Sequence, residues 1–469
     1  MVVLIREYDP STDREGTEAV DRDCEVGPTG GMSLHADLLG DPVARIRHSP
    51  AYLMLVAETS GGPGGRRIVG VIRGTVKPVA TGKHQSCAPA FASVGYILGL
   101  RVSPSHRRMG IALELVRRLE QWFALRGAEY AYMATEKSNE ASLRLFTGPK
   151  LGYSKFRTPS LLVHPVHAHR LRPPRRVTAL VPLDALDAEK LYRRRFARDV
   201  EFFPTDIGAV LGNTLSLGTF LAVVVGAEDA SKKFEWRGVE QFLASPPASW
   251  AVASLWDCGG VFRLEMRGAS RARRALAAAS RALDRAAKWM RVPSVPDFFR
   301  PFAGWFAYGL AGEGDEAPLA AKALLASFVN MARGRAAAVA VEVAACDPLR
   351  RRLPHWRRLS CTEDLWCMKR LWGGEDDVDG WDWAKSAPGL SIFVDPREGF
   401  RPDRARASGL NIGRGILPAC RTCCTPSVSE YSARGRQKLH AYVLCFETRK
   451  WSKAYGRQEI LQPLELKVI

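Results

Sequence analysis

The segment of residues 94–153 constrains the fold of this chain more than any other stretch. It predicts an apolar strand, a basic turn, an amphipathic helix, a second strand and a second helix, in that order. The turn, residues 107–112, reads Arg-Arg-Met-Gly-Ile-Ala. A turn in this setting directs backbone N–H groups and the positive end of the helix dipole at an anion. The segment therefore predicts an α/β fold that holds the pyrophosphate of a bulky cofactor.

The residues around this turn have the charge that a phosphate site requires. Four basic side chains lie on or next to it, and no acidic residue occurs from Gly95 to Leu113. Gly110 lets the backbone approach an anion without a Cβ atom. The alternative is an ordinary helix start with a structural role. The basic side chains are Arg101, His106, Arg107 and Arg108.

Length and composition limit the class of protein. A chain of 469 residues is expected to form more than one domain. The longest apolar run, residues 220–226, is too short to cross a bilayer, and the first residues lack the pattern of a secretory signal. We therefore expect no membrane association and a location in the nucleus or the cytoplasm. Scattered cysteines agree with a reducing compartment.

The net charge of +19 permits acidic partners. Residues 401–469 contribute 13 Lys/Arg and 5 Asp/Glu to it. No continuous basic stripe with interleaved aromatic residues is present, so direct nucleic-acid binding is not expected. No metal site is expected either: His164, His167 and His169 have no neighbouring carboxylate or cysteine along the chain, and Cys420, Cys423 and Cys424 have no matching partner pair.

A basic, proline-rich stretch at residues 170–176 divides the chain into two α/β parts. We expect a first domain at residues 1–165, a linker at 166–177 and a second domain at 178–395. Residues 396–469, rich in Arg, Ser and Cys, are expected to form a disordered or atypical extension.

The second part repeats the element order of the first. From residue 302 onward, strand, glycine turn, helix, strand, helix and strand follow one another. Its turn carries Glu313, Asp315 and Glu316, which suit a helix N-terminus but repel a pyrophosphate. This pattern predicts a degenerate second copy without cofactor binding, with an unrelated α/β domain as the alternative.

The strand, the R-x-x-G-x-A turn and the helix resemble the cofactor signature of the GNAT acetyltransferases. Longer strings are similar to the plant hookless family of GNAT-like N-acetyltransferases, among them LGLRVSPSHRRMGIALELV, ATEKSNEASLRLFTGPKLGY and SIFVDPRE. This resemblance runs from Val3 to about Glu398. It implies two things: acetyl-CoA as co-substrate with a protein or small-molecule amine as acceptor, and a nuclear role in ethylene- and auxin-linked differential growth.

The resemblance also implies roles for single residues. Acetyl-CoA would be held by the backbone of the strand, by the turn and by a side chain that starts the next helix. These positions are Leu100, Arg101, Val102, Arg107, Arg108, Met109, Gly110, Ile111, Ala112 and Asn139.

The catalytic residues are less well defined. Many GNAT enzymes have a Leu-Tyr pair whose tyrosine protonates the leaving thiolate, but here the pair is Leu145-Phe146. Tyr153 and Tyr96 are candidate substitutes for the acid, with an ordinary core or strand tyrosine as the alternative. Glu136, at the end of a strand, is the candidate base, with a solvated strand-end glutamate as the alternative. Two hypotheses remain: an N-acetyltransferase, or a weakly active or inactive GNAT-fold protein that acts through protein contacts. Neither the acceptor nor the oligomeric state follows from the sequence.

Two connections complete the expectations. Residues 80–90 are expected to form a loop that, with the loop at 25–49, shapes the acceptor pocket. In the second half, the strand at 261–266 is expected to pair with that at 250–256 across Cys258-Gly259-Gly260.

Overall fold

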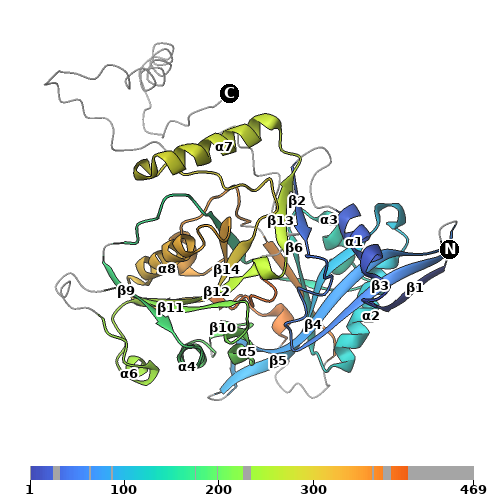
Figure 1. Cartoon of the computed structure of the whole chain (residues 1–469). Coiled ribbons are helices and arrows are strands. Elements are labelled where there is room, and N and C mark those ends of the chain that lie inside the picture. The colour runs from blue at the N-terminus through green and yellow to red at the C-terminus, as the bar shows by residue number, and fades with distance from the viewer. Residues whose placement is uncertain are drawn as a thin grey trace, which may run out of the picture. The chain divides into compact units, whose positions relative to one another are not determined.

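The computed structural model describes residues 2–24, 32–62, 65–85, 88–174, 176–197, 199–224, 234–361, 364–372 and 382–399. Strands of these residues form a seven-stranded N-terminal sheet and a six-stranded C-terminal sheet (Figure 1). Two short pairs join distant segments: β2 (Ser33–Asp37) with β13 (Arg263–Arg267), and β10 (Val200–Glu201) with β17 (Ser391–Ile392). No helix in the part described is long and apolar enough to span a membrane.

The N-terminal sheet is antiparallel except for one pair of strands. Its order is β1 (Val2–Glu7), β3 (Ala51–Gly62), β4 (Gly65–Gln85), β5 (Ala88–Val102), β6 (Tyr130–Glu136), β16 (Asp364–Arg370) and β7 (Ser154–Arg157). Strands β5 and β6 run parallel, and their pairing ends at Ile97 and Met133 although β5 continues to Val102. The two strands therefore separate towards their carboxyl ends. The helices of this part are α1 (Arg14–Asp23), α2 (Ile111–Leu125) and α3 (Glu140–Thr147).

Glycines in β4 and β5 allow α2 to pack directly on the sheet. A Cβ atom at Gly74 would lie 2.7 Å from a methyl of Leu119, and one at Gly95 would lie 2.5 Å from the ring of Phe123. Leu119 and Phe123 are fully buried on the apolar face of α2. At Gly95, as at Gly74, the missing side chain thus lets the side chains of α2 approach the strand backbone.

The C-terminal sheet repeats this topology. Its order is β9 (Val177–Leu183), β11 (Ser216–Val224), β12 (Trp250–Asp257), β14 (Gly304–Glu313), β15 (Ala338–Val343) and β8 (Ser160–Pro165). Strands β14 and β15 run parallel over four residue pairs, as β5 and β6 do. Both β5 and β14 carry a glycine with positive φ at a register shift, Gly99 (φ 62°) and Gly309 (φ 60°), each followed by leucine. Of the element order predicted for the second copy, the first strand, the glycine turn, the first helix and both later strands are present, but the second helix is only the 3-10 turn Pro348–Arg351.

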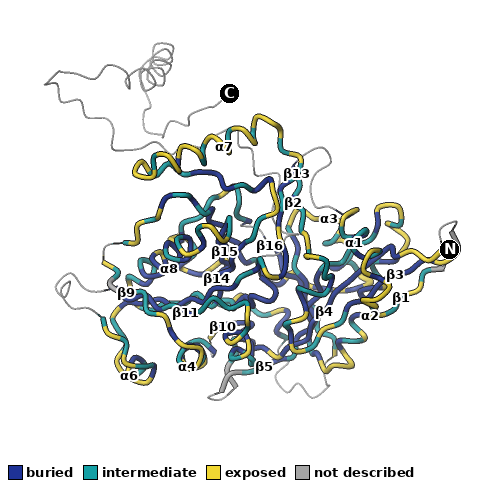
Figure 2. Tube along the Cα trace, in the orientation of Figure 1, coloured by how far each residue is buried: buried dark blue, intermediate teal, exposed yellow. Residues whose placement is uncertain are grey.

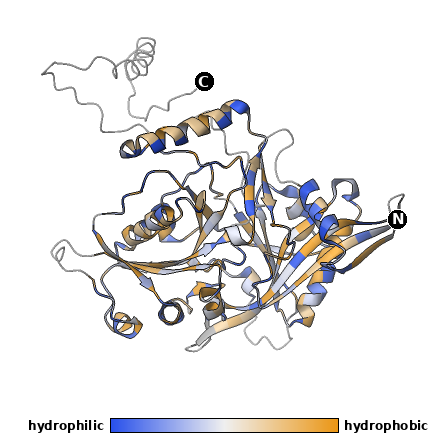
Figure 3. Cartoon of the chain, in the orientation of Figure 1, coloured by the Kyte–Doolittle hydropathy of each residue, from blue (hydrophilic) through white to orange (hydrophobic). Residues whose placement is uncertain are grey.

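Five helices belong to the second half: α4 (Ala185–Arg195), α5 (Ile207–Leu211), α6 (Val239–Ala244), α7 (Arg271–Ala286) and α8 (Ala317–Met331). Helix α8 follows β14 as α2 follows β5, and its alanines, leucines and Phe328 form the core under the C-terminal sheet. Apolar colour gathers along the strands and α8 in Figure 3.

The two sheets exchange a strand. β16, from the second half, lies between β6 and β7 in the N-terminal sheet, and β8, from the first half, is an edge strand of the C-terminal sheet. The boundaries expected from the sequence, 1–165 and 178–395, therefore do not coincide with the sheets. The linker expected at 166–177 also ends inside a strand, because β9 begins at Val177.

Two expected connections are wrong, and the loop expected at residues 25–49 contains the strand β2. Residues 80–90 continue the strands, since β4 extends to Gln85 and β5 begins at Ala88. The extension has a tertiary cause: the amide of Ala80 donates to the carbonyl of Phe203, and the amide of Phe202 donates to that of Ala80. Likewise β13 pairs with β2, not with β12, because the 3-10 turn at Cys258–Gly260 leads the chain away from β12. No local pattern in the sequence shows either partner.

The three histidines of the linker region form a buried stack. The rings of His167 and His169 lie 5.0 Å apart and nearly parallel, and His164 meets His167 edge-on. His169 contacts the carboxylate of Asp284 in α7 at 2.8 Å, and His167 contacts the carbonyl of Ser294 at 2.9 Å. Among the residues that the structure describes, no group of three His, Cys, Asp or Glu could hold a metal ion.

We expect His167 to make stability depend on pH. Burial lowers its pKa from 6.5 to about 4, so between these values the unfolded chain binds a proton that the folded chain does not. The contribution of His167 is complete above pH 6.5 and is lost as the pH falls towards 4, on the order of 3 kcal/mol in total. Denaturant unfolding at pH 7 and pH 5 measures it. His167→Asn keeps an N–H donor without titrating, and an equally steep loss in that variant would contradict the assignment.

Candidate functional site

The basic turn leaves the N-terminus of α2 open. After the short 3-10 helix Pro104–His106, Arg108 (φ 66°) and Gly110 (φ 81°) adopt left-handed conformations, and α2 begins at Ile111. No side chain caps α2, and a Cβ atom at Gly110 would meet nothing within 4 Å. The first-turn N–H groups therefore face open space, which is the arrangement that binds phosphate at helix N-termini. Because Arg108 is not glycine, its positive φ is a strained conformation, of the kind that concentrates at functional sites.

A cleft of about 780 Å³ begins at this turn and follows the gap between β5 and β6. None of its lining residues is acidic, while Arg101, His106, Arg107, Arg108 and Lys150 give it positive charge. Its inner end lies at the point where the strands separate, beside Ile97 and Met133. An elongated cleft with a cationic mouth and an apolar inner end suits a ligand with phosphates at one end.

Most of the predicted cofactor residues line this cleft. The structure brings together Leu100, Arg101, Val102, Arg107, Arg108, Gly110, Ile111, Ala112 and Asn139. Met109 is not among the lining residues, and its side chain is half exposed. Asn139 caps α3, as predicted, by accepting a hydrogen bond from the amide of Ser142. Lys150 was missed, because nothing in the loop that carries it distinguishes it from a surface lysine.

Tyr153 does not have the surroundings of a catalytic acid. Its hydroxyl donates to Oε1 of Glu120 at 2.8 Å, and its ring packs edge-on against Phe146. Burial, followed by the charge of Glu120, raises its pKa well above 10. It does not line the cleft. The prediction for Tyr153 is therefore wrong, since side-chain packing and the carboxylate of Glu120 direct its hydroxyl away from the gap.

Glu136 also lies outside the cleft. It is the last residue of β6 and accepts a hydrogen bond from the hydroxyl of Ser138 at 3.0 Å. Its neighbours Ala134 and Thr135 line the cleft. Glu136 is therefore adjacent to the cleft without lining it, and its role as a base stays a prediction.

Tyr96 is the tyrosine that lines the cleft, at its inner end. Its ring stacks on that of Tyr132 with the centroids 4.7 Å apart. The hydroxyl of Tyr132 donates to Oε2 of Glu398 at 2.5 Å. Glu398, at the far end of the described chain, thus contacts Tyr132, whose ring packs on the cleft-lining Tyr96.

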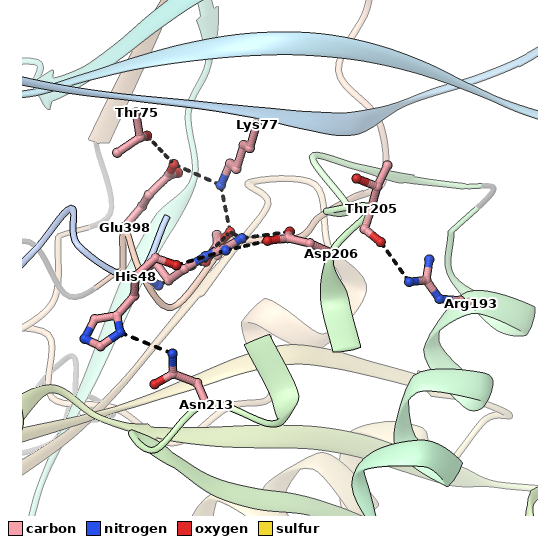
Figure 4. Close-up of polar contacts among 10 residues, drawn as sticks. His48, Thr75, Lys77, Arg193, Thr205, Asp206, Asn213 and Glu398 are labelled. Atoms are coloured by element: carbon pink, nitrogen blue, oxygen red, sulfur yellow. Dashed lines mark hydrogen bonds and ion pairs between the residues drawn. The ribbon is translucent and has the colours of Figure 1, made fainter. Parts of the chain in front are cut away.

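Glu398 belongs to a buried ionic cluster (Figure 4). Lys77 of β4 lies between Asp395 and Glu398, with Nζ 2.8 and 2.9 Å from their carboxylates. Arg397 bridges Asp395 and Asp206. Burial alone would raise the pKa of Asp395, but the cations of Arg397 and Lys77 outweigh it and hold that pKa below its usual range.

This cluster corrects the expected start of the extension at residue 396. Arg397 and Glu398 are 7% and 3% exposed, so the packed chain continues at least to them. Sequence reasoning missed the cluster because its residues are far apart along the chain. The one local signal is the set of charges after the apolar run Ser-Ile-Phe-Val at residues 391–394. Residues 400–469 of the expected extension, including Cys420, Cys423 and Cys424, lie outside the described residues.

The corresponding turn in the second half has a different geometry. Between β14 and α8 the chain has only Gly314, Asp315 and Glu316, and a Cβ atom at Gly314 would collide with the carbonyl oxygen of Ala248. The amide of Glu316 already donates to the hydroxyl of Ser249. The shorter turn agrees with a second copy that does not bind the cofactor, which stays a prediction.

Several known proteins are similar to this chain in sequence. A model of the Acetyltransferase (GNAT) family matches residues 25–153, which contain the turn and most of the cleft. The Arabidopsis thaliana protein "Probable N-acetyltransferase HLS1" is 53% identical over 409 residues, which cover 85% of this chain and 100% of that protein. "Acetyl transferase GW6a" of Oryza sativa subsp. japonica is 41% identical over 435 residues, covering 85% of this chain and 98% of that protein.

Among solved structures, a GCN5-related N-acetyltransferase from Kribbella flavida covers 79% of this chain and 71% of its own at 13% identity, with a TM-score of 0.38. The turn, the separated parallel strands and the matches in sequence define a GNAT acetyltransferase. The chain belongs to the hookless-like family of plant N-acetyltransferases.

Proposed function

We propose that this protein binds acetyl-CoA in the cleft between β5 and β6 and transfers the acetyl group directly to an amine, with lysine side chains of histones or other proteins as the acceptors. The observation that carries the proposal is the open N-terminus of α2 at the mouth of a cleft without acidic lining residues. The pyrophosphate would meet the backbone after Arg108 and the cations of the mouth.

Acetyl-CoA supplies the acetyl group as a thioester, and the chain supplies its surroundings. Leu98, Gly99 and Leu100 line the cleft beyond the last pair of β5 with β6, where a strand N–H suits polarisation of a carbonyl. Tyr96 is the side chain that we assign to the leaving thiolate, in place of the position occupied by Phe146. Apolar side chains around it, Ile97 and Met133, keep water from the inner end.

Calorimetry with acetyl-CoA tests the proposal, and Gly110→Asp is the decisive variant. We expect the wild type to bind and the variant to lose at least about a hundredfold in affinity, because its carboxylate would face the pyrophosphate. Gly127→Asp is the matched control: Gly127 lies at the other end of α2, also has a positive φ (71°) and has equally open surroundings. Absence of binding by the wild type would refute the proposal.

The second candidate function is a GNAT-fold regulator with little or no turnover. Phe146 has no proton to donate, and the hydroxyl of Tyr153 is held by Glu120. Thiol release from acetyl-CoA in the presence of histones, peptides and polyamines distinguishes the two functions. Binding without thiol release for any acceptor would favour the regulator.

The proposal includes a nuclear location and a role in ethylene- and auxin-linked growth. Both are carried over from the resemblance of the sequence to the plant hookless family. The basic stretch at residues 170–176 adds a weak localisation signal. Imaging of a fluorescent fusion tests the location, and signal confined to the cytoplasm would contradict it.

A further inference from the structure

Helix α7 presents most of its surface to solvent. Figure 2 shows it largely exposed along its whole length, and Figure 1 shows it at the margin of the body that contains the two sheets. Only Ala277 and Asp284 of its residues are fully buried. A helix of this length with so little buried surface needs an explanation beyond its own packing.

Polar contacts hold α7 to the body. The carboxylate of Asp284 accepts hydrogen bonds from the amides of Ala168 and His169 and from the hydroxyl of Ser294. One turn earlier, the hydroxyl of Ser280 accepts from the amide of Val295 at 3.1 Å. A surface helix normally turns its apolar stripe inwards and its polar face outwards. The anchors of α7 include a carboxylate and a hydroxyl, so its orientation departs from that rule.

The outward face of α7 combines a narrow apolar stripe with cations. Its exposed apolar residues recur at helical spacing: Ala272, Ala275, Ala278, Ala279, Ala282, Leu283 and Ala286. Exposed arginines lie along one side of the stripe, namely Arg271, Arg274 and Arg285, and the exposed Lys288 follows the helix. Directly after the helix, Trp289 is 82% exposed and Met290 is 51% exposed. Figure 3 shows the polar and apolar positions alternating along the helix.

We propose that this α7 face, the stripe with its four cations and Trp289, docks an acidic amphipathic helix of a partner protein. Alanines let a second helix approach closely, and Leu283, Trp289 and Met290 offer larger side chains for its apolar face. Acidic residues beside that apolar face would meet the flanking cations. The one acidic residue of α7, Asp284, is buried against the linker and does not oppose such a partner.

The positive charge of the α7 face favours an acidic partner helix over three other occupants. A second copy of α7 would bring cations against cations. Residues 401–469 carry 13 Lys/Arg and 5 Asp/Glu, so their net charge also has the wrong sign. Nucleic acid would satisfy the cations but would leave the Ala/Leu stripe without an apolar partner.

The test uses the full chain and a synthetic amphipathic peptide with leucines on one face and glutamates on both flanks. We expect fluorescence anisotropy to show micromolar binding, and a scrambled peptide of the same composition to bind about tenfold more weakly or less. The triple variant Arg271→Glu/Arg285→Glu/Lys288→Glu is expected to lose about tenfold in affinity or more. Ala279→Lys, which keeps the cations and disrupts the stripe, is expected to lose a similar factor.

Controls separate a specific surface from general charge. Arg117→Glu/Arg118→Glu reverses two exposed arginines on α2 and is expected to leave peptide binding unchanged. Thermal unfolding monitored by circular dichroism shows whether each variant is folded. The proposal would be overturned by equal affinity for the scrambled peptide, or by tighter binding of a DNA duplex than of the designed peptide. It would also be overturned if the wild-type protein formed a dimer that the triple variant did not form.

Discussion

A chain that ends at residue 165 is expected not to fold, although it contains the whole of the domain that the sequence predicts. It lacks β16, which forms seven residue pairs with β6 and also pairs with β7. The missing strand buries Leu365, Trp366, Cys367 and Met368 almost completely. Burial of four such side chains contributes roughly 8 kcal/mol, which is comparable with the entire stability of a domain, about 5–15 kcal/mol. β8 would lose its sheet partner β15 in addition.

Gel filtration and thermal unfolding of three preparations measure this effect. We expect residues 1–165 and residues 166–399 each to aggregate when expressed alone. Co-expressed, the two pieces are expected to form a soluble complex with a cooperative transition, because each then supplies the strand that the other lacks. A monomeric 1–165 fragment with a sharp transition would show that the exchanged strand is dispensable.

Lys77→Met is expected to lower the free energy of unfolding by about 3–5 kcal/mol. Lys77 is 2% exposed, and its removal leaves the carboxylates of Asp395 and Glu398 buried, with Arg397 as the remaining cation on Asp395. Stability falls because the two carboxylates repel each other and because nothing offsets the free energy needed to remove them from water. Urea unfolding at neutral pH measures it.

Two further variants make the Lys77 result specific. Lys322→Met removes an exposed lysine from α8 and is expected to change stability by no more than about 0.5 kcal/mol. Lys77→Met/Glu398→Gln also removes one of the two unpaired carboxylates. The double variant should therefore lose less free energy of unfolding than the sum of the losses in the two single variants. If Lys77→Met resembled Lys322→Met, the cluster would contribute little to stability.

The sequence correctly predicted the features that depend on residues close to one another along the chain. The alternation of apolar residues and the glycines within residues 94–153 are local, and so are the turn at Arg107 and the cap at Asn139. These features correctly located the helices α2 and α3 and the mouth of the cleft. The repeat of element order was visible for the same reason.

The sequence did not show which residues far apart along the chain come into contact. Continuation of β4 past Ala80 depends on Phe202 and Phe203, and β13 pairs with β2 from the other end of the chain. The hydrogen bond from Tyr153 to Glu120 and the ionic cluster around Lys77 also depend on tertiary contacts. The prediction for Tyr153 failed because packing, which no local pattern shows, decides where its hydroxyl points.

The strand exchange also means that the N-terminal sheet cannot be completed until late in synthesis. On a ribosome, β6 and β7 emerge long before residues 364–370, and at 5–20 residues per second the wait is on the order of ten seconds or longer. During that time the pairing edges of β6 and β7 that β16 will cover, and the apolar side chains around them, remain available to other chains. Production of this protein should therefore depend on chaperone capacity and translation speed more than production of a single GNAT domain does.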